Sequence, residues 1–308
     1  MDKQLLAQRR VLVVGDPMLD KYWFGDANRI SPEAPVPVVR IVRCDERLGG
    51  AANVALNVVS LGLQTTLMGV IGADDNGKKL TDLLTQAGIQ SRLTADPSLK
   101  TIIKLRIVAR QQQLVRIDFE EHPSGEVLAN LLADFSKIIE NFDVLVLSDY
   151  GKGGLCHIQE MIKIAREKNI PVLVDPKGDN YERYAGATVI TPNRSELALV
   201  TGTWTSEEDL TIKAQNLRKR LGLHALLLTR SEEGMTLFTD EGVETVPAQA
   251  REVFDVSGAG DTVIAVTASM IAAGISLQES VRIANRAGGI VVGKLGTASV
   301  SYNELFEE

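Results

Sequence analysis

The residues best suited to chemistry form a glycine-bracketed loop, Asp255-Val-Ser-Gly-Ala-Gly-Asp261, directly before an apolar run. Glycine allows the backbone to turn tightly and to present bare N–H groups. The apolar run is typical of a buried helix, and the unpaired amides at a helix N-terminus attract an anion. Asp261 beside an anion site suggests a base that removes a proton from a hydroxyl group attacking a phosphate.

Two other interpretations of this loop stay open on the local pattern. Aspartate and glycine are common at helix N-caps and turns, and an aspartate in the first turn stabilises a helix, so Asp261 also suits a structural role. A dinucleotide-binding fingerprint requires Gly-x-Gly-x-x-Gly, and Val263 stands where the third glycine should be. The sequence therefore lacks the signature of a nicotinamide-dependent oxidoreductase.

The composition excludes several classes of protein. With 308 residues, 44% of them hydrophobic, the chain can bury one large core, and we expect a single domain over residues 1–308. Its 33 basic and 40 acidic residues give a net charge of −7, and without a basic block we expect no binding to nucleic acid or membrane surfaces. We find no signal core and no apolar run near the roughly 20 residues of a membrane span.

The cysteines and histidines indicate neither disulfides nor a zinc site. Cys44 and Cys156 lie far apart in the sequence, and we expect them to be reduced, packed thiols of a cytoplasmic protein. The three histidines have no metal-ligand spacing.

Short apolar runs alternate with helical patterns, which is typical of a mostly parallel sheet covered by helices on both faces. The predicted fold class is therefore α/β. We expect strands at 11–15, 66–71, 144–148, 172–175, 188–191 and 225–229, and helices at 51–61, 78–87, 159–168, 207–221, 262–273 and 277–294.

Two segments interrupt this alternation. Residues 16–48 contain four prolines and an extended stretch at Val36–Val42. Residues 100–120 alternate basic with apolar side chains on either side of Gln111–Gln113, which is typical of an antiparallel hairpin. We expect both segments to form a small β lid inserted into the α/β body. An ordinary edge hairpin with a solvated basic face is the alternative.

Polar clusters follow five predicted strands at the point where each strand ends. Open parallel sheets bind ligands at the carboxyl ends of their strands. Any one cluster would suit a turn or a cap, but five of them indicate the rim of a single crevice. The clusters are Gly15–Asp20, Ser148–Gly153, Asp175–Gly178, Thr191–Glu196 and Thr229–Ser231.

Taken in order, these motifs resemble the ribokinase-like sugar kinases of the PfkB family over essentially the whole chain. Gly49-Gly-Ala-Ala-Asn-Val54 is similar to the family's N-terminal motif, Asn193-Arg-Ser-Glu196 to its N-x-x-E element, and Asp255–Asp261 to its C-terminal motif. Val256 replaces the family's usual threonine but leaves the glycines and Asp261 in place. The resemblance implies a ribokinase-like three-layer fold and the cofactors ATP and Mg²⁺, and it leaves a monovalent cation open.

The resemblance also implies a role for each residue of these motifs. Asp261 would accept the hydroxyl proton, and the amides of Gly258, Ala259 and Gly260 would hold the transferring phosphoryl group. On the nucleotide side it implies Asn193, Glu196, Thr229, Arg230, Ser231 and Asp255, with Glu196 reaching Mg²⁺ through water and Asn193 also suited to a helix cap. On the sugar side it implies Asp20 and Asn53 for hydroxyl groups, and Gly49 and Gly50 for a close backbone approach.

Further motifs resemble the branch of the family that phosphorylates a heptose 7-phosphate. This branch implies transfer of the ATP γ-phosphoryl group to the anomeric O1 of D-glycero-D-manno-heptose 7-phosphate, in ADP-heptose and lipopolysaccharide core synthesis. In many bacteria such a kinase is fused to a nucleotidyltransferase, so the chain is either a stand-alone kinase or the kinase part of a longer protein. The motifs are Asp16–Trp23, Arg29–Val38, Leu147–Gly153, Asp175–Gly178 and Thr229–Met235.

A sugar that already carries a phosphate needs a cationic partner. We expect Arg106, Lys104 and Lys177 to hold it, with solvated surface charges as the alternative. The anomer and the heptose stereoisomer do not follow from the sequence. A kinase of another sugar, such as fructose 1-phosphate or ribose, stays open, as does a non-catalytic nucleotide- or sugar-binding protein.

The lid hairpin also predicts self-association. Ile103, Leu105 and Ile107 form an apolar face on a strand with an unpaired edge, and such edges tend to find a partner. We expect a homodimer through the lids.

Overall fold

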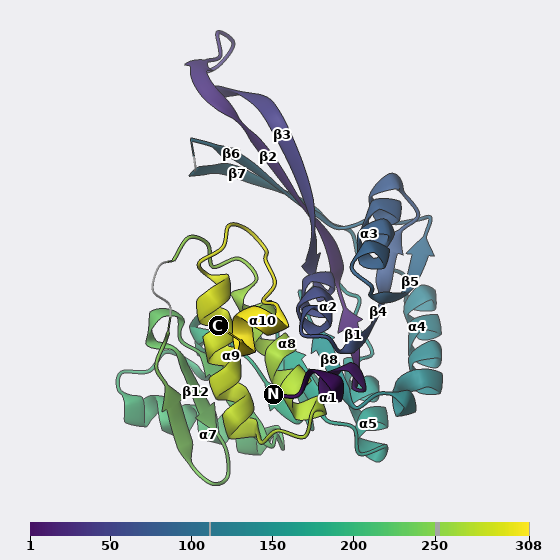
Figure 1. The fold of residues 1–308 in the computed structure, drawn as a ribbon, viewed down its shortest axis with the longest axis vertical. Helices are drawn as coiled ribbons and strands as arrows, with labels where there is room; N and C mark the ends of the chain where they lie inside the picture. The colour runs from purple at the N-terminus through teal and green to yellow at the C-terminus, as the bar shows by residue number, and fades with distance from the viewer. Residues whose placement is uncertain (111, 250–252, 308) are drawn as a thin grey trace.

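The computed structural model describes residues 1–110, 112–249 and 253–307, and shows an α/β body from which a β-sheet projects (Figure 1). The body contains a nine-stranded sheet in which the strands from β5 to β11 pair in parallel, while β12 and β13 add an antiparallel edge. Its order is β13 (Val243–Val246), β12 (Met235–Phe238), β11 (Ala225–Thr229), β10 (Val189–Ile190), β9 (Val172–Asp175), β8 (Val144–Ser148), β1 (Arg10–Gly15), β4 (Gln64–Gly72) and β5 (Gln90–Asp96).

Helices cover both faces of this sheet because its strands are apolar on both sides. Successive side chains of a strand point to opposite faces, so Val11 and Val13 enter one core while Leu12 and Val14 enter the other. The first core is closed by α1 (Lys3–Ala7), α2 (Ala51–Ser60), α3 (Asp75–Gln86), α8 (Ala259–Ala272), α9 (Leu277–Val291) and α10 (Tyr302–Phe306), and the second by α4 (Gly125–Ile138), α5 (Ile158–Glu167), α6 (Arg194–Thr201) and α7 (Glu207–Arg220).

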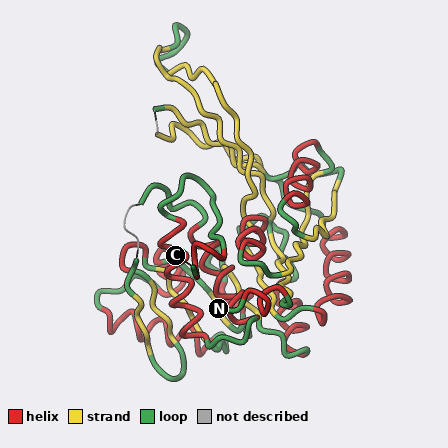
Figure 2. Tube along the Cα trace, viewed as in Figure 1, coloured by secondary structure: helices red, strands yellow, loops and turns green. Residues whose placement is uncertain are grey.

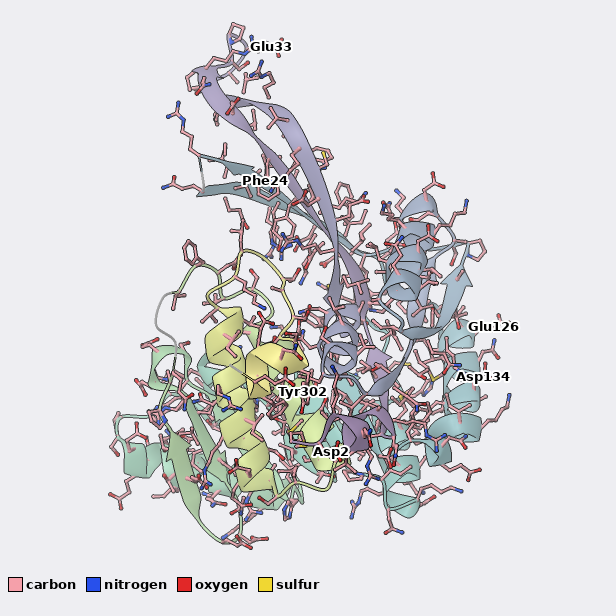
Figure 3. The ribbon with its side chains drawn as sticks, in the orientation of Figure 1. Asp2, Phe24, Glu33, Glu126, Asp134 and Tyr302 are labelled. Atoms are coloured by element: carbon pink, nitrogen blue, oxygen red, sulfur yellow. The ribbon has the colours of Figure 1, made fainter. Side chains whose placement is uncertain are left out.

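The two ends of the chain lie side by side in the first layer. Tyr302 on α10 donates a hydrogen bond from its hydroxyl to the carbonyl oxygen of Met1 at 2.5 Å, and Figure 3 shows Tyr302 close to Asp2. Among the described residues, no helix is long and apolar enough to cross a lipid bilayer.

The projecting sheet is the lid, and Figure 2 shows it as strands and turns without helices. Its strands are β2 (Pro17–Ile30), β3 (Pro37–Gly50), β6 (Ile103–Ala109) and β7 (Gln112–Phe119), in the order β3-β2-β6-β7. β2 pairs antiparallel with β3 and parallel with β6, which pairs antiparallel with β7. Since β2 follows β1 directly and β3 leads directly into α2, the base of the lid is anchored in the body. Its far tip carries Glu33 (Figure 3).

The expected α/β class, its two helical layers and the two lid segments are confirmed. The strands at 144–148, 172–175 and 225–229 have the expected bounds. The helix after the glycine loop begins at Ala259 rather than Thr262, so Asp261 lies in its first turn. Gln111, expected in the hairpin turn, lies outside the described residues. The elements that the sequence did not predict are α1, α4, α10, β5, β12 and β13.

Two expectations about individual side chains are corrected. Cys44 and Cys156 are exposed rather than packed, because one lies on the lid and the other in a surface turn before α5. The apolar face of β6 is not free: Leu105 is buried, and Ile103 and Ile107 are half-buried against neighbouring segments. The exposed apolar side chains of this hairpin lie on β7 instead: Leu114, Val115, Ile117 and Phe119.

A stability prediction follows from Arg218 on α7, which is one of the largest fully buried side chains. Its guanidinium donates to Gln215 Oε1, to the carbonyl oxygens of Leu223 and His224, and to Asp240. Arg218→Met leaves these acceptors unpaired, and we expect the free energy of unfolding in urea to fall by about 2–3 kcal/mol.

Arg220, on the same helix, provides the matched control. It is largely exposed and pairs with the exposed Glu182, so Arg220→Met should change the free energy of unfolding by no more than about 0.5 kcal/mol. Equal losses in the two variants would contradict a structural role for the buried guanidinium.

Candidate active site

A cleft of about 170 Å³ lies where the carboxyl ends of β8 to β11 meet the N-terminus of α8. A larger hollow of about 390 Å³ lies at the amino ends of β1, β4 and β5. No carboxylate lines this hollow, and most of its lining side chains are exposed. The smaller cleft contains the chemistry-bearing residues. It is lined by Asp149, Tyr150, Asp175, Pro176, Lys177, Thr191, Asn193, Glu196, Thr229, Gly258, Gly260 and Asp261.

Asp261 is buried in the first turn of α8, with only 3% of its surface exposed. Its Oδ2 accepts a hydrogen bond from Asn53 Nδ2 at 2.7 Å, and its Oδ1 accepts one from the Tyr150 hydroxyl at 2.6 Å. Burial raises the pKa of Asp261 to about 6, although the bonds from Asn53 and Tyr150 act in the opposite direction. A carboxylate with this pKa is ionised at neutral pH and still able to take up a proton, as a general base requires.

Asn53 is held by a buried chain of polar contacts between α2 and α8. Asn57, one turn further along α2, donates to the carbonyl oxygen of Asn53 at 3.0 Å and lies 3.4 Å from its Oδ1. Thr262 on α8 donates its hydroxyl proton to Asn57 Oδ1 at 3.1 Å. With its oxygen facing Asn57, the Asn53 amide directs its NH₂ group at Asp261.

The glycine loop is shaped by Gly258 and Asp255. Gly258 has a left-handed backbone (φ +79°), and an added Cβ there would lie 2.7 Å from Asn53 Nδ2, so both conformation and space favour glycine. Asp255 lies outside the cleft lining and accepts from the amides of Ser257 at 2.9 Å and Gly296 at 3.0 Å. Asp255 therefore orders the loop that carries the amides of Gly258, Ala259 and Gly260.

The lid brings a second group of expected residues to the rim of the cleft. Asp20 on β2 forms a buried ion pair with Arg106 on β6, with 2.7 Å between Oδ1 and Nη1. Gly49 pairs with Met18 across β2 and β3, and an added Cβ at Gly49 would lie 2.7 Å from Asp20 Oδ2. Gly50 has a positive φ (+55°) at the entry to α2. Lys104 places its ammonium 4.7 Å from the ring centre of Tyr150.

Only some of the residues expected to bind the nucleotide lie at the cleft. Asn193 caps α6 in a capping box with Glu196, so the helix-cap alternative is confirmed. Lys177 Nζ lies 2.9 Å from Glu196 Oε1, on this side of the cleft rather than with Lys104 and Arg106. Thr229 also lines the cleft.

Arg230 and Ser231 do not line the cleft. The buried Arg230 guanidinium forms two hydrogen bonds to Glu207, at 2.6 and 2.7 Å, and is also paired with Glu233. Its charge is therefore already compensated, which the sequence did not reveal.

The acidic side chains of the cleft fit a divalent cation. Burial, followed by the charges of Asp261 and Glu196, raises the pKa of Asp175 well above its usual range, and Lys177 only partly opposes this. A cation would relieve the same repulsion, and Mg²⁺ prefers carboxylate oxygens while keeping several waters. No three metal-ligating side chains converge among the described residues, so an ion held here would retain water in its shell.

The comparison with known families decides the class of protein. The sequence matches the model of the pfkB family carbohydrate kinases over residues 8–304. The chain belongs to the pfkB family. This sugar kinase also shares its fold with solved structures of low sequence identity. One is Escherichia coli phosphofructokinase-2 in complex with substrates and products (TM-score 0.84, 21% identity, 97% of each chain covered). Another is Arabidopsis thaliana ribokinase complexed with ribose and ATP (TM-score 0.76, 21% identity, 97% of each chain covered).

Curated relatives are much more similar in sequence. The kinase is 54% identical to the D-beta-D-heptose 7-phosphate kinase of Bordetella bronchiseptica over 303 residues, which cover 98% of this chain and 97% of that protein. It is 53% identical to the bifunctional protein HldE of Haemophilus influenzae over 97% of this chain, which spans 63% of that longer protein.

Several residues of the kinase's site were not predicted individually, including Asp149, Asp175 and Thr191 in the cleft lining. Three more make contacts that shape the site: Tyr150, Asp16 and Asn57. Tyr150 and Asp16 lie in clusters that were expected at the crevice rim, but no spacing indicated their contacts. Asp16 accepts from the amides of Tyr150, Lys152 and Gly154 at 3.0–3.1 Å and so fixes the loop after β8. Asn57 stands four residues after Asn53, and this helical spacing was the one signal available.

Gly49 generates a prediction for the sugar side. An added Cβ would lie 2.7 Å from Asp20 Oδ2, and Asp20 cannot easily move because Arg106 holds its other oxygen. We expect Gly49→Ala to lower kcat/KM for the sugar substrate by about 10–100-fold, with the KM for ATP changed by less than about twofold. Steady-state kinetics with each substrate varied in turn measures both.

Gly125→Ala is the control for this variant. An added Cβ at Gly125, the first residue of α4, meets nothing within 4 Å, so its kinetics should be unchanged. Unchanged sugar kinetics in Gly49→Ala would contradict the importance of the close approach to Asp20.

Proposed function

We propose that this kinase transfers the γ-phosphoryl group of Mg-ATP to the anomeric O1 of D-glycero-D-manno-heptose 7-phosphate, giving the 1,7-bisphosphate. The observation that carries the proposal is the 54% identity to a heptose 7-phosphate kinase over almost the full length of both chains. A buried carboxylate at a helix N-terminus, with cationic lid side chains beside it, supplies the chemistry that this reaction needs.

In the proposed step, Asp261 accepts the proton of the anomeric hydroxyl as the O1–phosphorus bond forms and the bond from phosphorus to the ADP oxygen breaks. The amides of Gly258, Ala259 and Gly260 stabilise the charge on the transferring oxygens, since preorganised donors act where charge develops. Asn53 and Asp20 would bind sugar hydroxyls beside the base, and the backbones of Gly49 and Gly50 would line the same subsite.

We infer that the nucleotide occupies the opposite side of the cleft, next to Asn193, Glu196 and Thr229. Bound Mg²⁺ would neutralise phosphate charge, and Glu196 would contact it through water. Arg230 and Ser231 would border the nucleotide from behind the cleft wall, and Asp255 would act by ordering the glycine loop. We propose a monovalent cation only as a further cofactor, to be tested separately from Mg²⁺.

Lys104 is the strongest candidate for the 7-phosphate. Among the described residues, no carboxylate lies within 4.0 Å of its ammonium, and burial lowers its pKa. A phosphate would supply the missing counter-charge. Arg106 would assist from its pair with Asp20, whereas Lys177 would contribute from the side of Glu196.

The biological setting is proposed on the same basis. The reaction belongs to ADP-heptose synthesis for the lipopolysaccharide core, and its use of ATP points to the cytoplasm. We infer that residues 1–308 form one kinase domain with an inserted lid, because β2 and β3 run without a linker into β1 and α2. A nucleotidyltransferase, fused or separate, would act on the product.

A substrate panel tests the proposed reaction. With Mg-ATP, we expect strong ADP release with D-glycero-D-manno-heptose 7-phosphate and little with ribose, fructose 1-phosphate or fructose 6-phosphate. Asp261→Asn should lower kcat by about 10²–10⁴-fold, because the positioned base is lost. Strong turnover of a neutral sugar without turnover of the heptose phosphate would refute the substrate, and full activity of Asp261→Asn would refute the base.

We also propose a homodimer through the lids. The edge strand β7 exposes Val115 (44%) and Phe119 (47%), and β3, the other edge of the lid sheet, exposes Val42 (64%). Exposed apolar strand edges pair readily with another chain.

Light scattering at micromolar concentration should give twice the monomer mass. Val115→Asp should give a monomer, because it places a charge in the proposed interface. Leu199→Asp is the control, since Leu199 is exposed on α6 in the body, and it should remain dimeric. A monomeric unaltered protein would refute the proposal.

A further inference from the structure

We propose that Tyr150 is a positioning residue of the transfer reaction, because its hydroxyl holds the Asp261 carboxylate and its ring is held by the lid. This inference rests on the proposed function, since it concerns the same base. Its basis is the 2.6 Å hydrogen bond to Asp261 Oδ1 and the Lys104 ammonium 4.7 Å from the ring centre.

Tyr150 is fixed at three points that belong to different parts of the molecule. Its amide donates to Asp16 Oδ2 at 3.0 Å, which ties its backbone to the end of β1. Its ring faces Lys104 of β6, and its hydroxyl reaches the first turn of α8. A side chain held by such independent contacts keeps its partner in one orientation, as a functional group must be kept for efficient reaction.

In the hydrogen bond between Tyr150 and Asp261, the phenol is always the donor. Burial, together with the charge of Asp261, raises the pKa of the Tyr150 phenol well above its usual range. Tyr150 therefore stays protonated at neutral pH and donates to Asp261 rather than competing with it for a proton. With Asn53 on Oδ2 and Tyr150 on Oδ1, both carboxylate oxygens are oriented by neutral donors.

The surroundings of Asp261 make this donor important for its charge. From α2 the neutral Asn53 contacts it, while the charge of Asp20 of β2 opposes its ionisation. Asp175 of β9 also lies nearby, and there the charge of Asp261 helps to raise the pKa of Asp175. Lys104 of β6 is the cation that favours the ionised form. Without the phenol, the carboxylate would lose one of two hydrogen bonds that favour its charged form, and the proton would bind more tightly.

Tyr150→Phe removes one oxygen atom and keeps the ring that faces Lys104. In the unaltered kinase, kcat/KM for the sugar should fall as the pH drops through about 6, because protonated Asp261 cannot accept a proton. In Tyr150→Phe this acid limb should move upward by about one pH unit, and kcat on its plateau should fall about tenfold. The KM for ATP should change by less than about twofold.

Tyr181→Phe is the matched control. The Tyr181 hydroxyl is buried and has no hydrogen-bond partner in the described part of the chain, so its removal should leave both the pH profile and kcat unchanged. The inference is overturned if Tyr150→Phe keeps the unaltered profile and plateau, if Tyr181→Phe shifts equally, or if Tyr150→Phe is faster than the unaltered kinase.

A measurement without any substrate separates this inference from the proposed function. Ionisation of Asp261, whose pKa is about 6, changes the hydrogen bond of the phenol. The ultraviolet difference spectrum of tyrosine between about pH 5 and about pH 7.5 should therefore show a transition at the pKa of Asp261. This transition should be absent in Tyr150→Phe and present in Tyr181→Phe. Its presence in all three proteins overturns the positioning role, whereas an inactive kinase with the expected spectra would overturn only the proposed substrate.

Discussion

The burial of one carboxylate is the constraint on which the rest of this structure depends. An isolated charge removed from water is very costly unless hydrogen bonds compensate it. Asp261 is compensated by Asn53 from α2 and by Tyr150 from the loop after β8, so the first turn of α8 must lie against both. The packing of α2 on α8 and the polar chain through Asn57 and Thr262 meet this requirement inside an otherwise apolar core.

A second buried carboxylate, Asp20 of the lid, is likewise compensated by a partner. Asp20 and Arg106 are both buried and stand on different lid strands, so their pairing depends on the parallel contact of β2 with β6. A charge pair of this kind fixes register more than it adds stability. Tyr22 strengthens the link, because its ring lies between Arg47 and Arg106 and its hydroxyl accepts from the amide of Thr297. Tyr22 thereby joins the lid to the loop region after α9, and Arg47 adds a second link, because its Nη1 donates to the carbonyl oxygens of Leu295 and Thr297.

The sequence predicts some elements to the residue and misses others for physical reasons. β8, β9 and β11 are buried on both faces, so they appear as unbroken apolar runs ending at polar residues. β5 is a polar edge strand and β2 changes register twice, so neither has a clean period. In the site, the strand-end clusters indicate which loops meet, because parallel strands end at one edge. The contact of Tyr150 with Asp261, and the pairing that occupies Arg230, depend on tertiary packing that no spacing records.

The path of the chain also orders events during synthesis. The lid is complete once Phe119 has been made, whereas α8 begins at Ala259 and closes the cleft much later. A nascent chain therefore displays the exposed edge strands of the lid while the body beneath them is unfinished. Exposed strand edges on partly made chains associate readily. If the proposed dimer forms through the lids, two ribosomes on one messenger would bring the lids together before either chain has made Asp261. Subunit pairing would then precede the appearance of catalytic activity.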